Sequence, residues 1–90
     1  MTKEMREKAV SRLAKQKAMW VIGGHENAIE DGVQDSMPSD DVLVQEVYNE
    51  VIKYPRVQVG GGVIELKKDI RFLGKDKLME IVRKEVQLAK

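Results

Sequence analysis

The chain has 90 residues, no cysteine and a formal net charge of +1. This length predicts one domain with a modest core, and 42% hydrophobic with 34% charged residues is typical of a globular chain. The lack of cysteine excludes disulfides, a thiolate nucleophile and cysteine-ligated zinc. The apolar run of residues 18–22 is too short for a signal peptide or a membrane span, so we expect a cytoplasmic protein.

The small net charge hides a strong segregation along the chain. Residues 1–22 carry a net charge of +4, residues 23–52 carry −8 and residues 53–90 carry +5. Between Lys17 and Lys53 there are eight acids and no lysine or arginine. Segregated charge governs encounter, self-association and the rejection of wrong partners, but it does not indicate a reaction.

The first segment of the chain predicts a helix over residues 2–22, because its apolar residues recur at a spacing of three and four. Gly23 and Gly24 are expected to stop this helix, since glycine commonly follows the last apolar turn. A short second helix is predicted over residues 27–37, although a glycine interrupts it. Gly32 lies in its middle and costs about 1 kcal/mol relative to alanine.

Residues 40–53 have the clearest helical pattern. Ser39 is a suitable N-cap, and Asp40 and Asp41 then lie in the first turn, where the positive end of the helix dipole stabilises them. Tyr54-Pro55 is expected to end this helix, because the residue before proline is disfavoured in helical conformation. Its predicted apolar stripe consists of Leu43, Val44, Val47, Tyr48, Val51 and Ile52.

After Pro55 the pattern changes to an alternation of apolar and polar residues. One alternating run covers residues 57–59 and a longer one covers residues 64–72, with three glycines between them. This arrangement predicts a β-hairpin. The length of the second run leaves open whether residues 64–72 form one strand or two. A last helix is expected over residues 76–89.

The expected element order is α-(α)-α-β-β-α in a single domain of residues 1–90. This order predicts the α+β class. Three main helices, with a fourth short one, would pack on a small antiparallel β-hairpin or three-stranded meander.

The chemistry-bearing residues match no catalytic or metal-binding pattern. His25 is the only histidine, and its neighbour Glu26 faces another direction on a helix, so we expect a solvated histidine at a helix junction. An EF-hand loop that begins at Asp31 would need oxygen ligands at its third and twelfth positions, but these are Val33 and Val42. The three glycines lead into a strand, whereas a phosphate-binding loop leads into a helix. We therefore expect no enzymatic activity, no metal and no cofactor.

The charge pattern favours a small binding or accessory domain. We expect protein–protein interaction or self-association, as in a homodimer, through the acidic and basic faces. Trp20 and Tyr48 are plausible interface anchors, with core packing the favoured interpretation of Trp20. Six acids have no local structural reason and are the candidate partner-binding residues: Glu26, Glu30, Asp31, Asp35, Glu46 and Glu50.

A DNA-binding regulator of winged-helix-like order is the alternative. The first helix and the hairpin wing would contact phosphates. The candidate nucleic-acid-binding residues are Lys8, Arg12, Lys15, Arg56, Lys67 and Lys68. Against this alternative, the helix that would enter the groove is acidic, and acids oppose the electrostatic attraction that supplies non-specific affinity. Base rates for short cytoplasmic chains favour an accessory protein of a bacterium or a mobile element.

Overall fold

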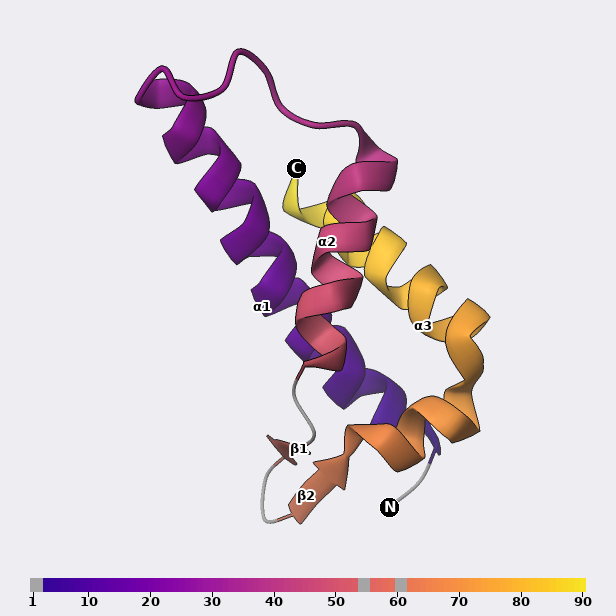
Figure 1. Ribbon diagram of the computed structural model, residues 1–90. Coiled ribbons are helices and arrows are strands. Elements are labelled where there is room, and N and C mark those ends of the chain that lie inside the picture. The colour runs from indigo at the N-terminus through magenta and orange to yellow at the C-terminus, as the bar shows by residue number, and fades with distance from the viewer. Residues whose placement is uncertain (1–2, 54–55, 60–61) are drawn as a thin grey trace.

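The computed structural model describes residues 3–53, 56–59 and 62–90, and the side chains of residues 3–53 and 74–90. The elements in chain order are α1 (Lys3–Glu30), α2 (Asp40–Ile52), β1 (Arg56–Val59), β2 (Gly62–Glu65) and α3 (Leu66–Ala89). Helix α1 spans the length of the molecule, α2 returns beside it, and α3 runs back along both (Figure 1). The body is elongated, with extents of 45 × 25 × 20 Å.

The hydrophobic core lies where the three helices meet, and each helix buries one stripe of apolar residues. On α1 the stripe includes Ala14 and Ala18, whose small side chains allow the neighbouring helices to approach closely. The buried positions of the other two helices follow their periodicity, as expected for one face of an amphipathic helix. They are Leu43, Val44, Val47 and Val51 on α2, and Leu78, Ile81, Val82 and Val86 on α3.

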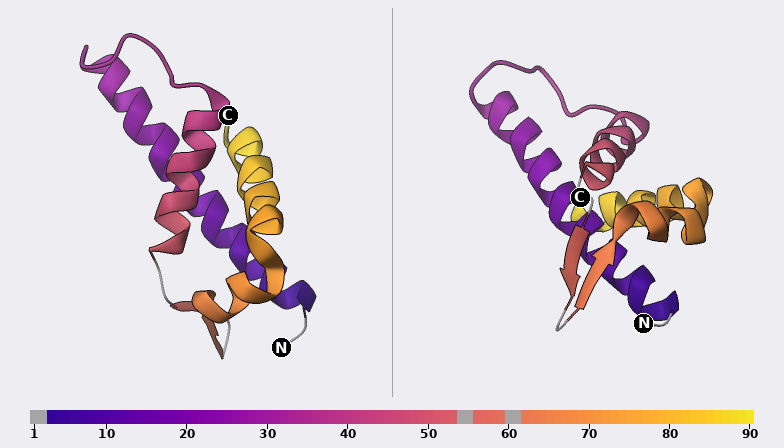
Figure 2. Two further views of the ribbon diagram at one scale, coloured as in Figure 1. Left: turned by 45° about the vertical axis from the view of Figure 1, so that its right-hand side comes forward. Right: turned by 60° about the horizontal axis from the view of Figure 1, so that its bottom comes forward.

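The predicted α+β architecture is wrong, because the core consists of helix packed against helix. Every buried residue among the described side chains belongs to α1, α2 or α3. The two strands are four residues long and pair antiparallel, with Val57 opposite Ile64. They lie at one end of the helical body and form no layer for the helices to pack on (Figure 2). The chain is therefore a small helical domain, and no three-stranded meander occurs in its described part.

The second predicted alternating run is largely helical. Of residues 64–72, only Ile64 and Glu65 are extended, because α3 begins at Leu66. Apolar residues 66, 70 and 73 fit a helical spacing, whereas 66, 70 and 72 fit an alternating one, so the pattern was ambiguous. Gly74, with φ 78° and ψ 157°, kinks α3, and the helix then continues to Ala89 as predicted.

Helix α1 passes through Gly23 and Gly24, so the predicted stop is wrong. Residues 27–30 form its last turn, and the predicted short helix over residues 27–37 is absent. The terminating glycine is Gly32, with φ +78°. Its N–H donates to the Ile29 carbonyl at 3.1 Å, and the Val33 N–H donates to the Ala28 carbonyl at 2.8 Å. These two bonds form a Schellman motif, which requires a left-handed residue at Gly32.

The start of α2 is confirmed as predicted. Ser39 is the N-cap in extended conformation, and its hydroxyl accepts a hydrogen bond from the Val42 N–H at 3.5 Å. The helix ends at Ile52, with Lys53 as its C-cap. The predicted stop at Tyr54-Pro55 and the first two glycines of the predicted link, at 60 and 61, lie outside the described residues.

Alanine in place of Gly24 should stabilise the fold. A Cβ there meets nothing within 4 Å, and alanine is favoured over glycine in a helix by about 1 kcal/mol. Thermal unfolding followed by circular dichroism should show a Tm about 4–8 °C higher. The matched change Gly32→Ala should lower Tm, because a φ of +78° disfavours any Cβ. A lower Tm for Gly24→Ala would contradict a continuous α1.

Candidate functional site

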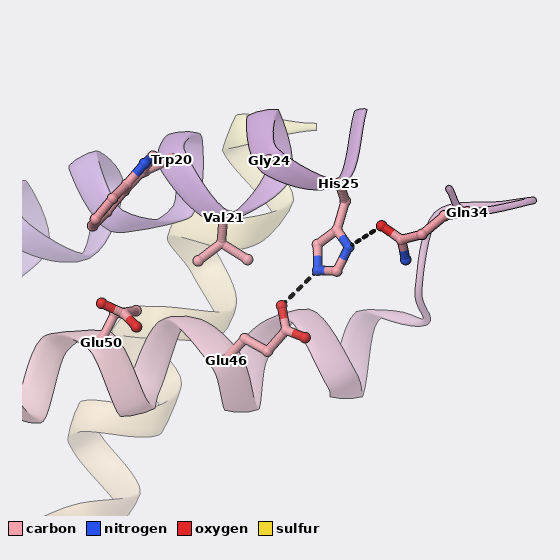
Figure 3. A pocket seen from close by; sticks show the side chains of 7 residues that line it. All are labelled: Trp20, Val21, Gly24, His25, Gln34, Glu46 and Glu50. Atoms are coloured by element: carbon pink, nitrogen blue, oxygen red, sulfur yellow. Dashed lines mark hydrogen bonds and ion pairs between the residues drawn. The ribbon is translucent and has the colours of Figure 1, made fainter. Parts of the chain in front are cut away.

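A groove between α1 and α2 is the best-formed candidate site. It has a volume of about 350 Å³, and Figure 3 shows Trp20 and Glu50 toward one end and His25 and Glu46 toward the other. A second depression continues along α2 to Ile52 and shares part of the same lining. We call this feature the α1–α2 groove. Its lining residues are Trp20, Val21, Gly24, His25, Gln34, Glu46 and Glu50.

Trp20 is 62% exposed, so its predicted place in the core is wrong. The Lys17 ammonium lies 4.5 Å from the centroid of the indole ring, which is a cation–π contact. Lys17 itself is only 7% exposed. A buried lysine thus contacts an aromatic ring that is largely exposed to solvent. Tyr48, the other predicted anchor, packs against the core while partly buried.

His25 connects three segments of the chain at the other end of the groove. Its Nε2 lies 2.6 Å from a Glu46 carboxylate oxygen on α2, and its Nδ1 lies 2.8 Å from the Gln34 side-chain oxygen in the loop. The side chain is 18% exposed, so the expectation of a solvated histidine at a helix junction is wrong. Because α1 continues past Gly23 and Gly24, His25 is held on a helix that faces α2.

The surroundings of His25 favour its protonated form. Both ring nitrogens face oxygen acceptors, and two N–H donors are present only in the imidazolium. The hydrogen bond with Glu46 raises the pKa of His25 most, the bond with Gln34 raises it further, and burial opposes them. The hydrogen bond between His25 and Glu46 connects α1 to α2. Protonation of His25 therefore strengthens the packing of the two helices.

This arrangement is suited to holding helices together. The residues that line the groove include no hydroxyl or thiol to act as a nucleophile. Both imidazole nitrogens are engaged, whereas a general base needs one free to reach a substrate proton. Among the described residues, no group of three or more histidines and acids is placed to hold a metal ion.

The structure divides the six predicted partner-binding acids into two groups. Glu46 and Glu50 line the groove and have partners in the chain, His25 for the first and the Lys53 ammonium at 2.7 Å for the second. The other four are exposed and form no ion pair with a described residue. They lie on the last turns of α1 and in the loop that follows, and are Glu26, Glu30, Asp31 and Asp35.

Negative charge therefore gathers at the negative end of a helix dipole. No basic residue lies in the last turn of α1. Acids at this end are typically unfavourable by about 0.3–1 kcal/mol each. In contrast, Asp40 and Asp41 lie at the favourable end of α2. Asp41 also pairs with Arg83 on α3, and Asp40 pairs with Lys90, which follows α3.

The residues of the DNA-binding alternative are spread over three elements. Lys8, Arg12 and Lys15 are exposed on α1. Arg56 belongs to β1, while Lys67 and Lys68 lie in the first turn of α3, and these three side chains are outside the described part. Helix α2, which would have to enter the DNA groove, directs Glu46 toward α1 and Asp41 toward α3.

Comparison with protein-family models, with curated proteins and with solved structures found no match to this chain. In the described part, no helix is both long enough and apolar enough to cross a membrane.

Sequence reasoning missed the groove because it ended the first helix too early. Trp20, Val21, Gly24 and His25 are spaced by one and four residues, which places them on one side of a continuous helix. A predicted helix that continued past the two glycines would have placed these four residues on one face. Nothing in the sequence pairs His25 with Gln34, because that contact depends on the path of the loop.

The stability contributed by His25 should fall as pH rises. Its pKa is raised in the folded protein, so the contribution is complete below the unfolded value of about 6.5 and is lost through the folded pKa. Chemical unfolding from about pH 6 to pH 9 should show the difference between the original chain and His25→Asn shrinking with pH. The variant Glu46→Gln should lower the pKa of His25 measured by NMR. A stability difference that grows with pH would contradict this assignment.

Proposed function

We propose that the chain is a non-enzymatic binding domain whose α1–α2 groove receives a basic amphipathic helix of a protein partner. The observation that carries the proposal is a 62% exposed Trp20 at the edge of a groove that also contains Glu46 and Glu50. An aromatic anchor beside accessible acids fits a segment with apolar side chains on one face and lysine or arginine on the other.

The apolar part of the groove supports an amphipathic occupant. Trp20 lies near one end, Val21 lies between the ends, and Ile52 is 43% exposed where the second depression follows α2. Large apolar side chains gathered in a concave surface commonly mark an interaction site. Burial of an indole contributes strongly to binding, because the ring is large and loses little conformational freedom.

Gly24 supports a close approach of the partner. It costs α1 about 1 kcal/mol relative to alanine, yet a Cβ at this position would meet nothing within 4 Å. Packing within the chain therefore does not require a glycine here. Gly24 lines the groove, and the missing side chain leaves room for a partner backbone to approach α1.

The charges around the groove support a basic partner. The Glu46 side chain is 41% exposed although it contacts His25, so part of its carboxylate remains accessible. Residues 23–52 carry eight acids and no lysine or arginine. A surface of one sign accelerates encounter with a partner of opposite sign and disfavours acidic competitors.

Trp20 is the only tryptophan, so its fluorescence reports directly on the groove. We expect a blue shift of its emission on titration with a synthetic helical peptide that has leucine on one face and lysine and arginine on the other. A matched peptide with glutamate in place of the basic residues should give no shift. By calorimetry, Trp20→Ala should weaken binding of the basic peptide about 30-fold, as expected for an anchor worth about 2 kcal/mol.

Two variants provide controls for this experiment. Glu50→Gln should weaken peptide binding, whereas Leu88→Ala should leave it unchanged, because Leu88 is 70% exposed on α3 outside the groove. An equal response to both peptides, or none, would contradict the proposal. Binding of duplex DNA at about 50 mM salt that Lys8→Glu abolishes, without peptide binding, would support the DNA-binding alternative instead.

A further inference from the structure

The outer face of α1, away from the core, carries a second pattern that the groove does not use. Residues at steps of three and four lie on one face of a helix. The side chains of this face are exposed apart from a half-buried glycine. We call the set the outer stripe of α1, and it consists of Lys8, Arg12, Lys15, Met19, Gly23, Glu26 and Glu30.

Charge changes sign once along the outer stripe. Its N-terminal half is basic, Met19 is at its centre, and its C-terminal half ends in Glu26 and Glu30. None of the five charged residues forms an ion pair or hydrogen bond with a described residue. The stripe therefore presents both signs of charge to solvent without neutralising either within the described part of the chain.

Such a stripe is complementary to itself when two copies lie antiparallel. Arg12 and Glu26 lie seven residues before and after Met19, and Lys8 and Glu30 lie eleven residues before and after it. A two-fold axis through Met19 thus brings Arg12 opposite Glu26 and Lys8 opposite Glu30 of the other copy. In the same register Lys15 lies opposite Gly23, where the absence of a side chain leaves room for the lysine stem.

We propose that the chain forms a two-fold symmetric dimer through the outer stripe, with antiparallel α1 helices and Met19 on the axis. A parallel arrangement would instead place bases against bases and acids against acids. The stripe from Lys8 to Glu30 is on the order of 33 Å long at 1.5 Å per residue. Two copies would therefore be in contact along most of α1.

An apolar patch beside the axis supports this arrangement. Met19 is 60% exposed and Leu88 of α3 is 70% exposed, and both line a hollow of about 510 Å³. In the dimer, Met19 of each copy lies beside this hollow in the other. Exposed ion pairs are individually weak and screened by salt, so the apolar patch is needed to hold the dimer and the charges fix its register.

The dimer leaves the α1–α2 groove accessible. Trp20 and Gly24 line the groove and are not part of the outer stripe. The inference therefore does not depend on the proposed function. Each of the two can fail without the other.

Charge reversal across the axis tests the register. Sedimentation velocity at about 50 mM NaCl should show a dimer that dissociates as salt is raised to about 500 mM. Arg12→Glu places two acids opposite each other, and Glu26→Arg places two bases opposite each other, so each should raise the dimer Kd at least tenfold. The double variant Arg12→Glu/Glu26→Arg restores opposite charges and should return Kd to within about threefold of the original.

Controls separate this pairing from a general effect of charge. Lys75→Glu changes the charge at an exposed site on α3, far along the helix from Leu88 and outside the stripe, so it should leave Kd unchanged. Because the chain has no cysteine, Met19→Cys should crosslink two copies on oxidation. The variant Asn27→Cys should not crosslink, because residue 27 is exposed but lies far from the two-fold axis. Circular dichroism of every variant verifies that it folds.

Two results would overturn the proposal. The original chain could remain monomeric at about 50 mM NaCl up to about 1 mM protein. Alternatively, the double variant could remain as impaired as either single variant, which would exclude the pairing of Arg12 with Glu26 across the axis.

Discussion

The continuity of α1 through Gly23 and Gly24 is the constraint on which the candidate site depends. The two glycines cost about 2 kcal/mol of helix stability relative to alanine, and only contacts beyond them can offset that cost. His25 supplies hydrogen bonds to Glu46 and to Gln34. The Schellman motif at Gly32 then ends the helix with its last carbonyl groups partly satisfied. A helix that ended at Ile22 would have neither the groove nor the acidic half of the outer stripe.

The second constraint is electrostatic. Helix α1 has acids at the end where its own dipole is negative, and no base in its last turn. Natural sequences depart from such local rules chiefly where a function requires it. Here the departures coincide: unfavourable acids, two helix-destabilising glycines and an exposed tryptophan all occur between Trp20 and Glu30. That coincidence is the physical reason to propose that a partner binds at this end of the molecule.

The predictable part of the fold was the part governed by local rules. Ser39 and the two aspartates that follow determine where α2 begins. Four of the six residues in the predicted stripe of α2 are buried, whereas Tyr48 is partly buried and Ile52 is exposed. The fold class was not predictable in this way. Residues 66–73 satisfy a helical and an alternating spacing at once, so only packing against the rest of the chain decides between them.

The candidate site was predictable only in part, because its contacts connect distant segments. Glu46 and Glu50 were among the six acids singled out from the sequence, and both line the groove, although Glu50 has a local partner in Lys53 three residues further on. Trp20 was assigned to the core because tryptophan is highly buried on average. In this chain the indole ring is exposed and contacts the buried Lys17, and an average over proteins does not predict such a contact. The partner of His25 is 21 residues away and on another helix, so sequence spacing could not identify it.

The most direct test of this account is the backbone conformation of residues 23–32 in solution. Carbon chemical shifts from NMR distinguish helix from coil residue by residue, and the chain is small enough for full assignment. A continuous α1 predicts helical shifts through Gly23 and Gly24 as far as Glu30, followed by a break at Gly32. Coil shifts that begin at Gly23 would show that the helix stops there and would contradict both the groove and the outer stripe.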